Sequence, residues 1–530
     1  MKEITIETLD QVKEVARDLI TDWAMRLKDV HYADIRMEAS QARAAVALDG
    51  NPIGAHSDWE ISFGVKVIAG DKIRASGYYG RHLGVMDIKN FSSKIKEGIY
   101  HAHQRALANA RYKLSAKEQF GSLASSLYDT SLAPVEIHQE IHQVPFQIDP
   151  RQVSIEKVIK EVVGISKDIQ QVQGIVANKV ISEMIIMRRL FLSSEGASID
   201  FTWPKVEFIP FIVTRPVGEQ RLVNYDCLGD FVGWEVMEGR NVYGKDSRTF
   251  ALDLAREAVR LSQAPVLPSS EKEVVVVTDP HYNALLVHEI VGHPVELDRI
   301  LKWETGYAGR SRFLKSFDCH QIGRKVASPL VTAYSDPTLL GYGFLPFDDE
   351  GVKARKVVHI DKGVLTADFL NSRETVAIMQ TMGIPVQPNG AARARDPVYV
   401  PLIRMTNTVF APGESNPEDI IREVDEGYYF KGWSIPSISE RRENFRISAR
   451  QVWKIENGEL TTLYRWGSIS SDSEKYLKSI DAVGNDFKLF PIFNCGKGQP
   501  MQAIWVGNGG PTMRGRAKVV GGRMKGGSTV

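Results

Sequence analysis

The sequence predicts an α+β protein built from three units. Its opening segment has the spacing of an amphipathic helix, later segments alternate between apolar and polar residues as strands do, and two breaks rich in proline or serine interrupt the chain. We place the units at residues 1–125, 126–268 and 269–530. We expect them to be an N-terminal helix and sheet domain, a central α/β domain and a C-terminal β-rich domain.

The first unit begins with a helix. Apolar residues three and four positions apart predict it between residues 9 and 27. Residues 32–39 and 61–68 alternate and predict strands of a half-exposed sheet, and helical spacing returns over 92–111. From 113 to 152 the chain is polar and irregular, so we expect a linker or an inserted arm there.

The second unit repeats helix and strand patterns. Helical spacing predicts helices at 154–172 and 247–262, with β-branched runs at 174–192 and 206–214 between them. Prolines then mark a second boundary. The third unit opens with a run of four valines at 274–277, which predicts a buried strand, and most of the remaining chain is strand-like and rich in glycine.

The composition limits the partners and the compartment. Sixty-six Lys and Arg balance sixty-five Asp and Glu, which leaves a net charge of +1 and no field to hold nucleic acid or an anionic membrane. No apolar run is long enough to span a membrane, and the first residues lack the basic flank of a secretory signal. The three cysteines suit a reducing compartment. We therefore expect a cytoplasmic protein with neither a nucleic-acid nor a membrane partner.

A metal motif comes after the valine strand. The chain reads His288-Glu289-Ile290-Val291-Gly292-His293, and two imidazoles suit zinc while Glu289 can reach a metal-bound water as general base. On a regular helix, residues five positions apart lie about 140° apart, so both rings could not reach one ion. We therefore expect a bulge or an early helix end, favoured by Gly292 and by Pro294, which lacks an amide hydrogen.

Two alternatives to a metal site exist for this motif. Chance gives only about 0.02 such patterns in a chain of this composition, which disfavours coincidence. The other alternative is that both histidines are hydrogen-bonded core groups on a buried helix. Two histidines also do not complete a zinc site, so a third ligand must come from elsewhere. The residues alone leave six candidates for it: Cys495, Cys319, His320, His359, Glu296 and Asp298.

Two other charged segments each have two possible interpretations. The acidic turn, residues 348–351, could hold a second cation, although an acidic turn between strands is the commoner case. Arg441, Arg442 and Arg446 could line a peptide channel or pair with neighbouring carboxylates. The sequence does not separate these readings.

Nine short segments occur in one order along the chain: residues 288–293, 306–310, 347–351, 362–365, 404–408, 483–486, 494–497, 507–512 and 519–522. With these segments, the sequence resembles the TldD/PmbA metalloproteases, and within them the metal-bearing TldD-type subunit. The related PmbA (TldE) subunits lack the metal motif. The resemblance implies that His288, His293 and Cys495 bind zinc and that Glu289 is the catalytic base.

The family resemblance also implies an activity. It implies a zinc metallopeptidase that hydrolyses unfolded or small peptides, with the metal helix in the C-terminal β-rich domain. Because family members enclose the site between subunits, we expect a homodimer or a heterodimer with a PmbA/TldE-like subunit. The alternative is a non-catalytic peptide-binding or assembly subunit with a structural metal, which four protein ligands would close.

Overall fold

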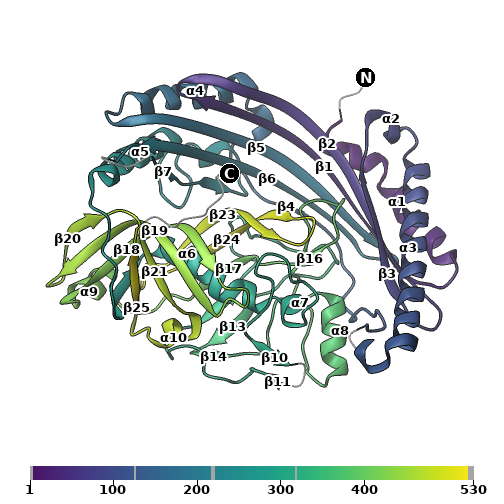
Figure 1. The fold of residues 1–530 in the computed structure, drawn as a ribbon. Coiled ribbons are helices and arrows are strands. Elements are labelled where there is room, and N and C mark those ends of the chain that lie inside the picture. The colour runs from purple at the N-terminus through teal and green to yellow at the C-terminus, as the bar shows by residue number, and fades with distance from the viewer. Residues whose placement is uncertain (1–3, 125–126, 217–220, 317–318, 523–530) are drawn as a thin grey trace.

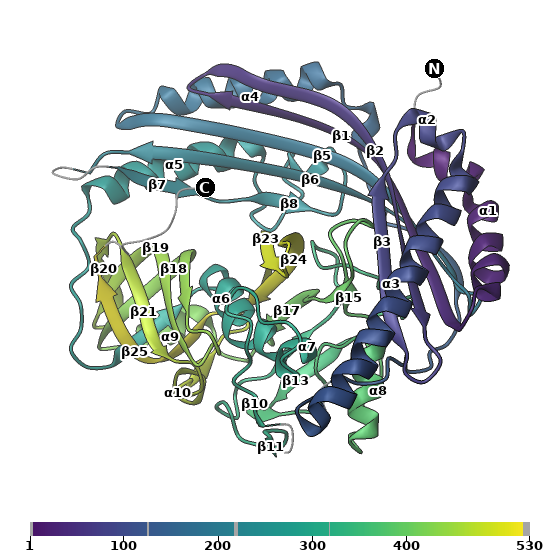
Figure 2. The same ribbon diagram turned by 45° about the vertical axis from the view of Figure 1, so that its right-hand side comes forward.

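A long, curved sheet arches over a smaller β-rich unit in the computed structural model (Figures 1 and 2). The structure describes residues 4–124, 127–216, 221–316 and 319–522. Helices and strands alternate in the first half and strands dominate the second, so the predicted α+β class is confirmed. Within these residues, no helix is both long enough and apolar enough to cross a membrane.

The large sheet joins the first two predicted units. Its strands follow the order β3-β2-β1-β5-β6-β4, with β7 and β8 also paired to β6. Strands β1 and β5, one from each predicted unit, pair along most of their length. The boundary at residue 125 therefore divides one continuous sheet, and the domain limits stay a prediction. The strands are β1 Val30–Leu48, β2 Asn51–Ala69, β3 Ala75–His82, β4 Gln139–Gln143, β5 Ile175–Ser193, β6 Ser198–Thr214, β7 Leu222–Tyr225 and β8 Leu228–Asp230.

Helices cover this sheet close to where the apolar spacing predicts them. The opening segment is helical from residue 6 to residue 26, in short 3-10, α and π turns. Helices α4 (Ile155–Gln170) and α5 (Ser247–Gln263) each begin at a side chain that caps the first turn. Helix α3 (Phe91–Phe120) packs against β2 and β3 and runs past residue 113. The linker expected from there is wrong for residues 113–120, whose Lys, Ala, Glu and Gln are good helix formers.

The C-terminal unit contains two sheets with a helix between them. One has the order β14-β13-β12-β17-β24-β23 and the other β18-β9-β25-β21-β19-β20, with β22 paired to β25. The strands are β9 Val274–Thr278, β12 Ala333–Ser335, β13 Val357–Asp361, β14 Val364–Leu365, β17 Asn407–Phe410, β18 Glu426–Ile438, β19 Asn444–Glu456, β20 Glu459–Tyr464, β21 Gly467–Asp472, β22 Ala482–Val483, β23 Lys488–Lys497, β24 Gln502–Gly510 and β25 Met513–Gly521. The remaining short elements of this unit are the hairpins β10 Leu314–Ser316 with β11 Cys319–His320 and β15 Ala392–Arg393 with β16 Leu402–Ile403, and helices α8 Arg373–Thr381, α9 Pro417–Arg422 and α10 Ser473–Lys478. Helix α2 (Val85–Ile88) precedes α3 in the first half of the chain.

Helix α6 (Pro280–Val287) carries the metal motif into this core. Every one of its residues is buried, and it contacts β17, β23 and β24 of one sheet and β18 of the other. Asp279 caps its first turn by accepting a hydrogen bond from the Tyr282 amide. Most of its side chains are apolar, and the buried Asn283 donates hydrogen bonds to the Thr278 and Pro511 carbonyls, so the helix is suited to this enclosed position. The motif at its C-terminal end therefore lies inside the unit.

The acidic turn attaches this unit to the large sheet. Asp349 accepts hydrogen bonds from Arg36 of β1 at 2.9 Å and from Arg189 of β5 at 2.7 Å. Glu350 accepts one from Lys66 of β2 at 2.9 Å. These three basic side chains neutralise two of the turn's carboxylates. The residues form an acidic turn, the commoner of the two alternatives, and the structure adds that two of its carboxylates are paired with protein cations.

Candidate metal centre

A π-helical turn separates the two histidines of the motif. The turn spans His288–Gly292, and the His293 amide donates to the His288 carbonyl five residues back. This bond places the two side chains on the same side of the helix. Their ring centroids are 4.7 Å apart and the ring planes are nearly perpendicular. The distortion that the five-residue spacing predicts is confirmed.

Gly292 fits in the π-turn because it has no side chain. Its φ of −55° is ordinary helical backbone, so the position does not need glycine for its conformation. A Cβ there would lie 2.0 Å from the Met405 sulfur, which is fully buried. Our expectation that glycine loosens the backbone is therefore replaced by a packing reason. Pro294 lies in the 3-10 turn His293–Val295 that ends the helix, as its missing amide hydrogen predicts.

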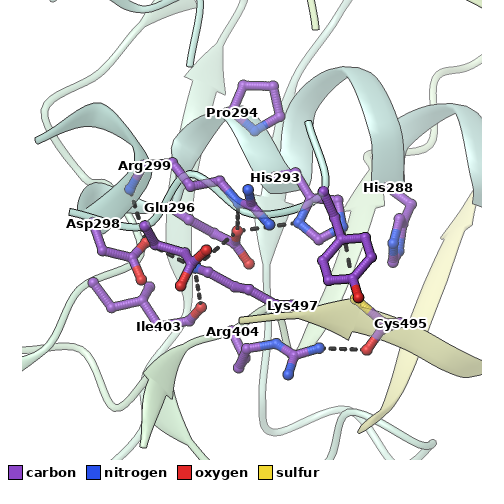
Figure 3. A network of polar contacts seen from close by, with 12 residues as sticks. His288, His293, Pro294, Glu296, Asp298, Arg299, Ile403, Arg404, Cys495 and Lys497 are labelled. Atoms are coloured by element: carbon purple, nitrogen blue, oxygen red, sulfur yellow. Dashed lines mark hydrogen bonds and ion pairs between the residues drawn. The ribbon is translucent and has the colours of Figure 1, made fainter. Parts of the chain in front are cut away.

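Cys495 meets these histidines from strand β23. Its sulfur lies 3.7 Å from His293 Nε2 (Figure 3). One ligand atom from each of His288, His293 and Cys495 lies within 4.8 Å of the other two, and all three residues are only 3% exposed. Across the described part of the chain, this is the one group of three such side chains that could hold a metal ion.

The other candidate ligands have different surroundings. His359 is a core residue whose ring nitrogens lie 2.8 Å from Ser335 Oγ and 2.9 Å from the Asp368 carbonyl. Asp298 accepts a hydrogen bond from Lys497 at 2.7 Å. Glu296 contacts the Nδ1 side of the His293 ring. The side chains of Cys319 and His320 lie outside the described residues, so these two candidates stay untested.

Each histidine has a partner that orients its ring. His288 Nδ1 lies 3.0 Å from Asn508 Oδ1, and His293 Nδ1 lies 3.1 Å from Glu296 Oε2. When both Nδ1 atoms donate to these oxygens, both Nε2 lone pairs are left for a metal. Sequence reasoning missed Asn508 and treated Glu296 as a possible ligand. The only signal for Asn508 was its place in the glycine-rich segment 507–510.

Buried charges hold Glu296 in place. Arg299 Nε donates to Glu296 Oε2 at 2.7 Å, and Lys497 Nζ lies 3.1 Å from the same oxygen (Figure 3). Burial raises the pKa of Glu296, but Lys497, His293 and Arg299 lower it more, so its pKa is well below its ordinary value. The carboxylate is therefore ionised and can accept the His293 proton.

The charges of the cluster favour a thiolate. Burial raises the pKa of Cys495, but His288, His293 and Arg404 lower it more, so the pKa of the thiol is well below its ordinary value. Burial lowers the pKa of His288, but Cys495 and Glu289 raise it to about 9. Thiolate is the form of cysteine that ligates metals, and a bound cation would replace the histidine proton as its counter-charge. Two imidazoles and a thiolate are a donor set that fits zinc.

Glu289 lies beside the cluster with a partner of its own. Its side chain is 12% exposed, and its Oε2 accepts a hydrogen bond from Arg442 Nη1. Burial raises the pKa of Glu289, but Arg442, His288 and His293 lower it more, to below its ordinary value. The carboxylate is therefore ionised at neutral pH. Of the two alternatives for Arg442, a channel residue or a partner of a carboxylate, the structure contains the ion pair with Glu289.

Known proteins resemble this chain along most of its length. Residues 271–522 match the family model described as PmbA/TldA metallopeptidase C-terminal domain. A protein named Metalloprotease from Methanothermobacter thermautotrophicus is 31% identical over 68% of this chain and 74% of its own length. One named Zinc metalloprotease TldD homolog from Saccharolobus solfataricus is 28% identical over 47% of this chain and 52% of its own.

The fold is also known from crystallography. The crystal structure of TldE from Thermococcus kodakarensis covers 94% of this chain and 98% of its own, with a TM-score of 0.65 and 18% identity. That likeness is one of fold. The family match and the metalloprotease relative together identify the chain as a member of the TldD/PmbA family of metalloproteases.

Proposed function

We propose that this metalloprotease is a zinc peptidase in which His288, His293 and Cys495 hold the ion and Glu289 is the general base. The observation that carries the proposal is the convergence of three buried ligand atoms within 4.8 Å, next to an ionised carboxylate. A zinc ion held there would polarise the scissile carbonyl and lower the pKa of a water molecule that it binds. The relative named as a zinc metalloprotease supports the choice of metal.

Glu289 moves the proton in this scheme. Its carboxylate takes a proton from the attacking water and passes it to the leaving amine. A base must be ionised to accept the proton, and the charges around Glu289 favour that form. It must also not be a metal ligand, and Glu289 is absent from the three-residue group in the described structure. Both properties support the assignment.

The number of ligands favours a catalytic site over a structural one. A structural zinc is closed by four protein ligands, whereas a catalytic zinc keeps three and one open position. Within the described residues, the group contains three. The alternative, a non-catalytic peptide-binding or assembly subunit with a structural metal, requires a fourth protein ligand.

The position of Cys495 suggests how a substrate binds. Strand β23 is the last strand in the order of its sheet, so one of its edges is not used by a neighbouring strand of that sheet. An extended peptide can add to such an edge through main-chain hydrogen bonds. Unfolded or small peptides can adopt that conformation, whereas folded chains cannot. We therefore propose them as substrates.

Assembly belongs to the same proposal. The first eight residues of β2, 51–58, are all exposed, and β3 pairs only with residues 62–69 of β2, so this part of β2 forms an exposed edge of the large sheet. We propose that the protein forms a homodimer or pairs with a PmbA/TldE-like subunit. Light scattering of the active protein measures this directly, and a fully active monomer would contradict it.

The activity can be tested with one polypeptide in two states. Zinc-loaded protein is incubated with an unfolded polypeptide and with its folded counterpart, and the products are analysed by mass spectrometry. The proposal predicts cleavage of the unfolded form alone, abolished by a chelator. The alternative predicts intact, bound peptide and four protein ligands in X-ray absorption spectra.

A further inference from the structure

We infer that Arg442 is a positioning residue for Glu289, which it holds by one carboxylate oxygen so that the other is free to accept the proton. The inference rests on the proposed function, because it assigns a role within the same site. Arg442 Nη1 donates to Glu289 Oε2 and lies 3.5 Å from the Glu289 carbonyl oxygen. Among the described residues, every hydrogen bond of this carboxylate uses Oε2, so Oε1 has no protein partner.

The guanidinium itself is held at two further points. Arg442 Nε donates to the Ala308 carbonyl at 3.1 Å, and Nη2 donates to the Tyr307 carbonyl at 3.3 Å. Its side chain is 5% exposed. A planar group bound on three of its nitrogens has little rotational freedom. The orientation of the Glu289 carboxylate is therefore fixed by backbone atoms of another loop.

That loop has a strained conformation. Tyr307 and Ala308 have φ of 54° and 53°, and Arg442 has φ of 61°, all in the left-handed region that favours glycine. Gly309 has no room for a side chain, since a Cβ would lie 2.2 Å from the Thr305 carbonyl carbon. A non-glycine residue in the left-handed region costs about 1–3 kcal/mol of folding free energy, and such residues concentrate at functional sites. Here the strained residues are the two whose carbonyls accept from Arg442, and Arg442 itself.

A purely structural ion pair is the competing explanation. The two explanations can be separated by substituting the Arg442 side chain, because the main chain at this position has contacts of its own. The Arg442 carbonyl accepts hydrogen bonds from Ser473 Oγ at 2.8 Å and from Arg312 at 3.2 Å. Any side chain at position 442 keeps these contacts, so substitutions there retain part of the local structure. A structural pair would affect stability alone, whereas a positioning residue would affect turnover through Glu289.

The test is a double-mutant cycle. Arg442→Gln and Arg442→Lys are made in the parent and in a Glu289→Ala background, with Arg422→Gln as the matched control. Arg422 lies on α9 and pairs with Asp419, and both side chains are exposed. In the parent, Arg442→Gln should lower kcat by roughly 10- to 100-fold with KM within about 3-fold and zinc near one per chain. Arg442→Lys should restore part of that loss, and Arg422→Gln should change nothing.

In the Glu289→Ala background, Arg442→Gln should change kcat by less than about 2-fold, because the carboxylate that Arg442 positions is absent. Melting of the metal-free protein gives a second readout: Arg442→Gln should lower the melting temperature more when Glu289 is present than when it is absent. An unchanged kcat for Arg442→Gln, or an equal fall in both backgrounds, would overturn the inference. If Arg442→Gln does not fold, the lysine variant decides by the same cycle. Full activity of Glu289→Ala would instead overturn the proposed function.

Discussion

His293 Nε2 lies 3.7 Å from Cys495 Sγ, although 202 positions separate the two residues in the chain. His293 begins the 3-10 turn that ends the helical segment after α6, and Cys495 belongs to an end strand of one of the two sheets around that helix. The cluster therefore exists only when the C-terminal unit is folded. Binding of a metal to it should stabilise the folded state.

Removal of the thiolate should remove the metal. Cys495→Ala deletes the one ligand that lies outside the helix, so zinc content should fall well below one per chain. Cys227 is also buried, but its thiol contacts the Leu228 carbonyl and lies outside the cluster. Cys227→Ala should therefore keep zinc. Elemental analysis measures both, and a chelator should lower the melting temperature of the parent but not of Cys495→Ala.

The partner of His288 should tune metal affinity. Asn508 Oδ1 accepts from His288 Nδ1, and its amide nitrogen donates to the Thr408 carbonyl at 3.0 Å. Asn508→Ala removes the acceptor that fixes the ring, so we expect zinc affinity to fall roughly 10- to 100-fold. Competition with a chromophoric chelator measures the affinity. Equal affinities for Asn508→Ala and the parent would show that the ring does not need this partner.

The size of residue 292 should control the π-turn. A Cβ at Gly292 would lie 2.0 Å from Met405 Sδ, so Gly292→Ala should lower the free energy of unfolding by about 1–3 kcal/mol. Gly164 on α4 is the matched control, since a Cβ there meets only the end of the Arg248 side chain at 3.1 Å. Gly164→Ala should not destabilise the protein. Urea unfolding of the metal-free variants checks this, and two equal effects would contradict the packing argument.

His359 should make stability depend on pH. Burial lowers the pKa of its imidazole to about 4, whereas the ordinary value is 6.5. Because the unfolded chain binds the proton more tightly, this residue's contribution is present above pH 6.5 and is lost as the pH falls toward 4. Between pH 7 and pH 5, the parent should lose about 2 kcal/mol more than His359→Gln. If the free energy of unfolding falls by the same amount between pH 7 and pH 5 in both proteins, this prediction is contradicted.

Local patterns predicted much of this fold. The spacing of apolar residues located α3, α4 and α5, and the five-residue interval between His288 and His293 required the distortion that the π-turn provides. The helices and the π-turn both depend on residues that are close to one another in the sequence. The end of α3 differs from the prediction because the polar composition after residue 113 predicts a linker, although most residues from 113 to 120 form helices well.

Long-range contacts could not be predicted in the same way. From the residues alone Cys495 was one of six candidates, and only the family resemblance selected it. Glu296 was a plausible ligand until the structure placed it behind His293. Arg442 lies 153 residues from Glu289, and no spacing rule connects them. Such pairs depend on how the sheets pack.

The most direct measurement is the turnover of a Glu289→Gln variant. Glutamine retains an oxygen for Arg442 but accepts no proton, which makes it a better choice than alanine, since alanine would leave a buried guanidinium unpaired. We predict zinc near one per chain, unchanged binding of an uncleaved peptide, and kcat lower by about 10²- to 10⁴-fold. A variant that retains zinc and cleaves unfolded peptide within a few-fold of the parent would contradict the account.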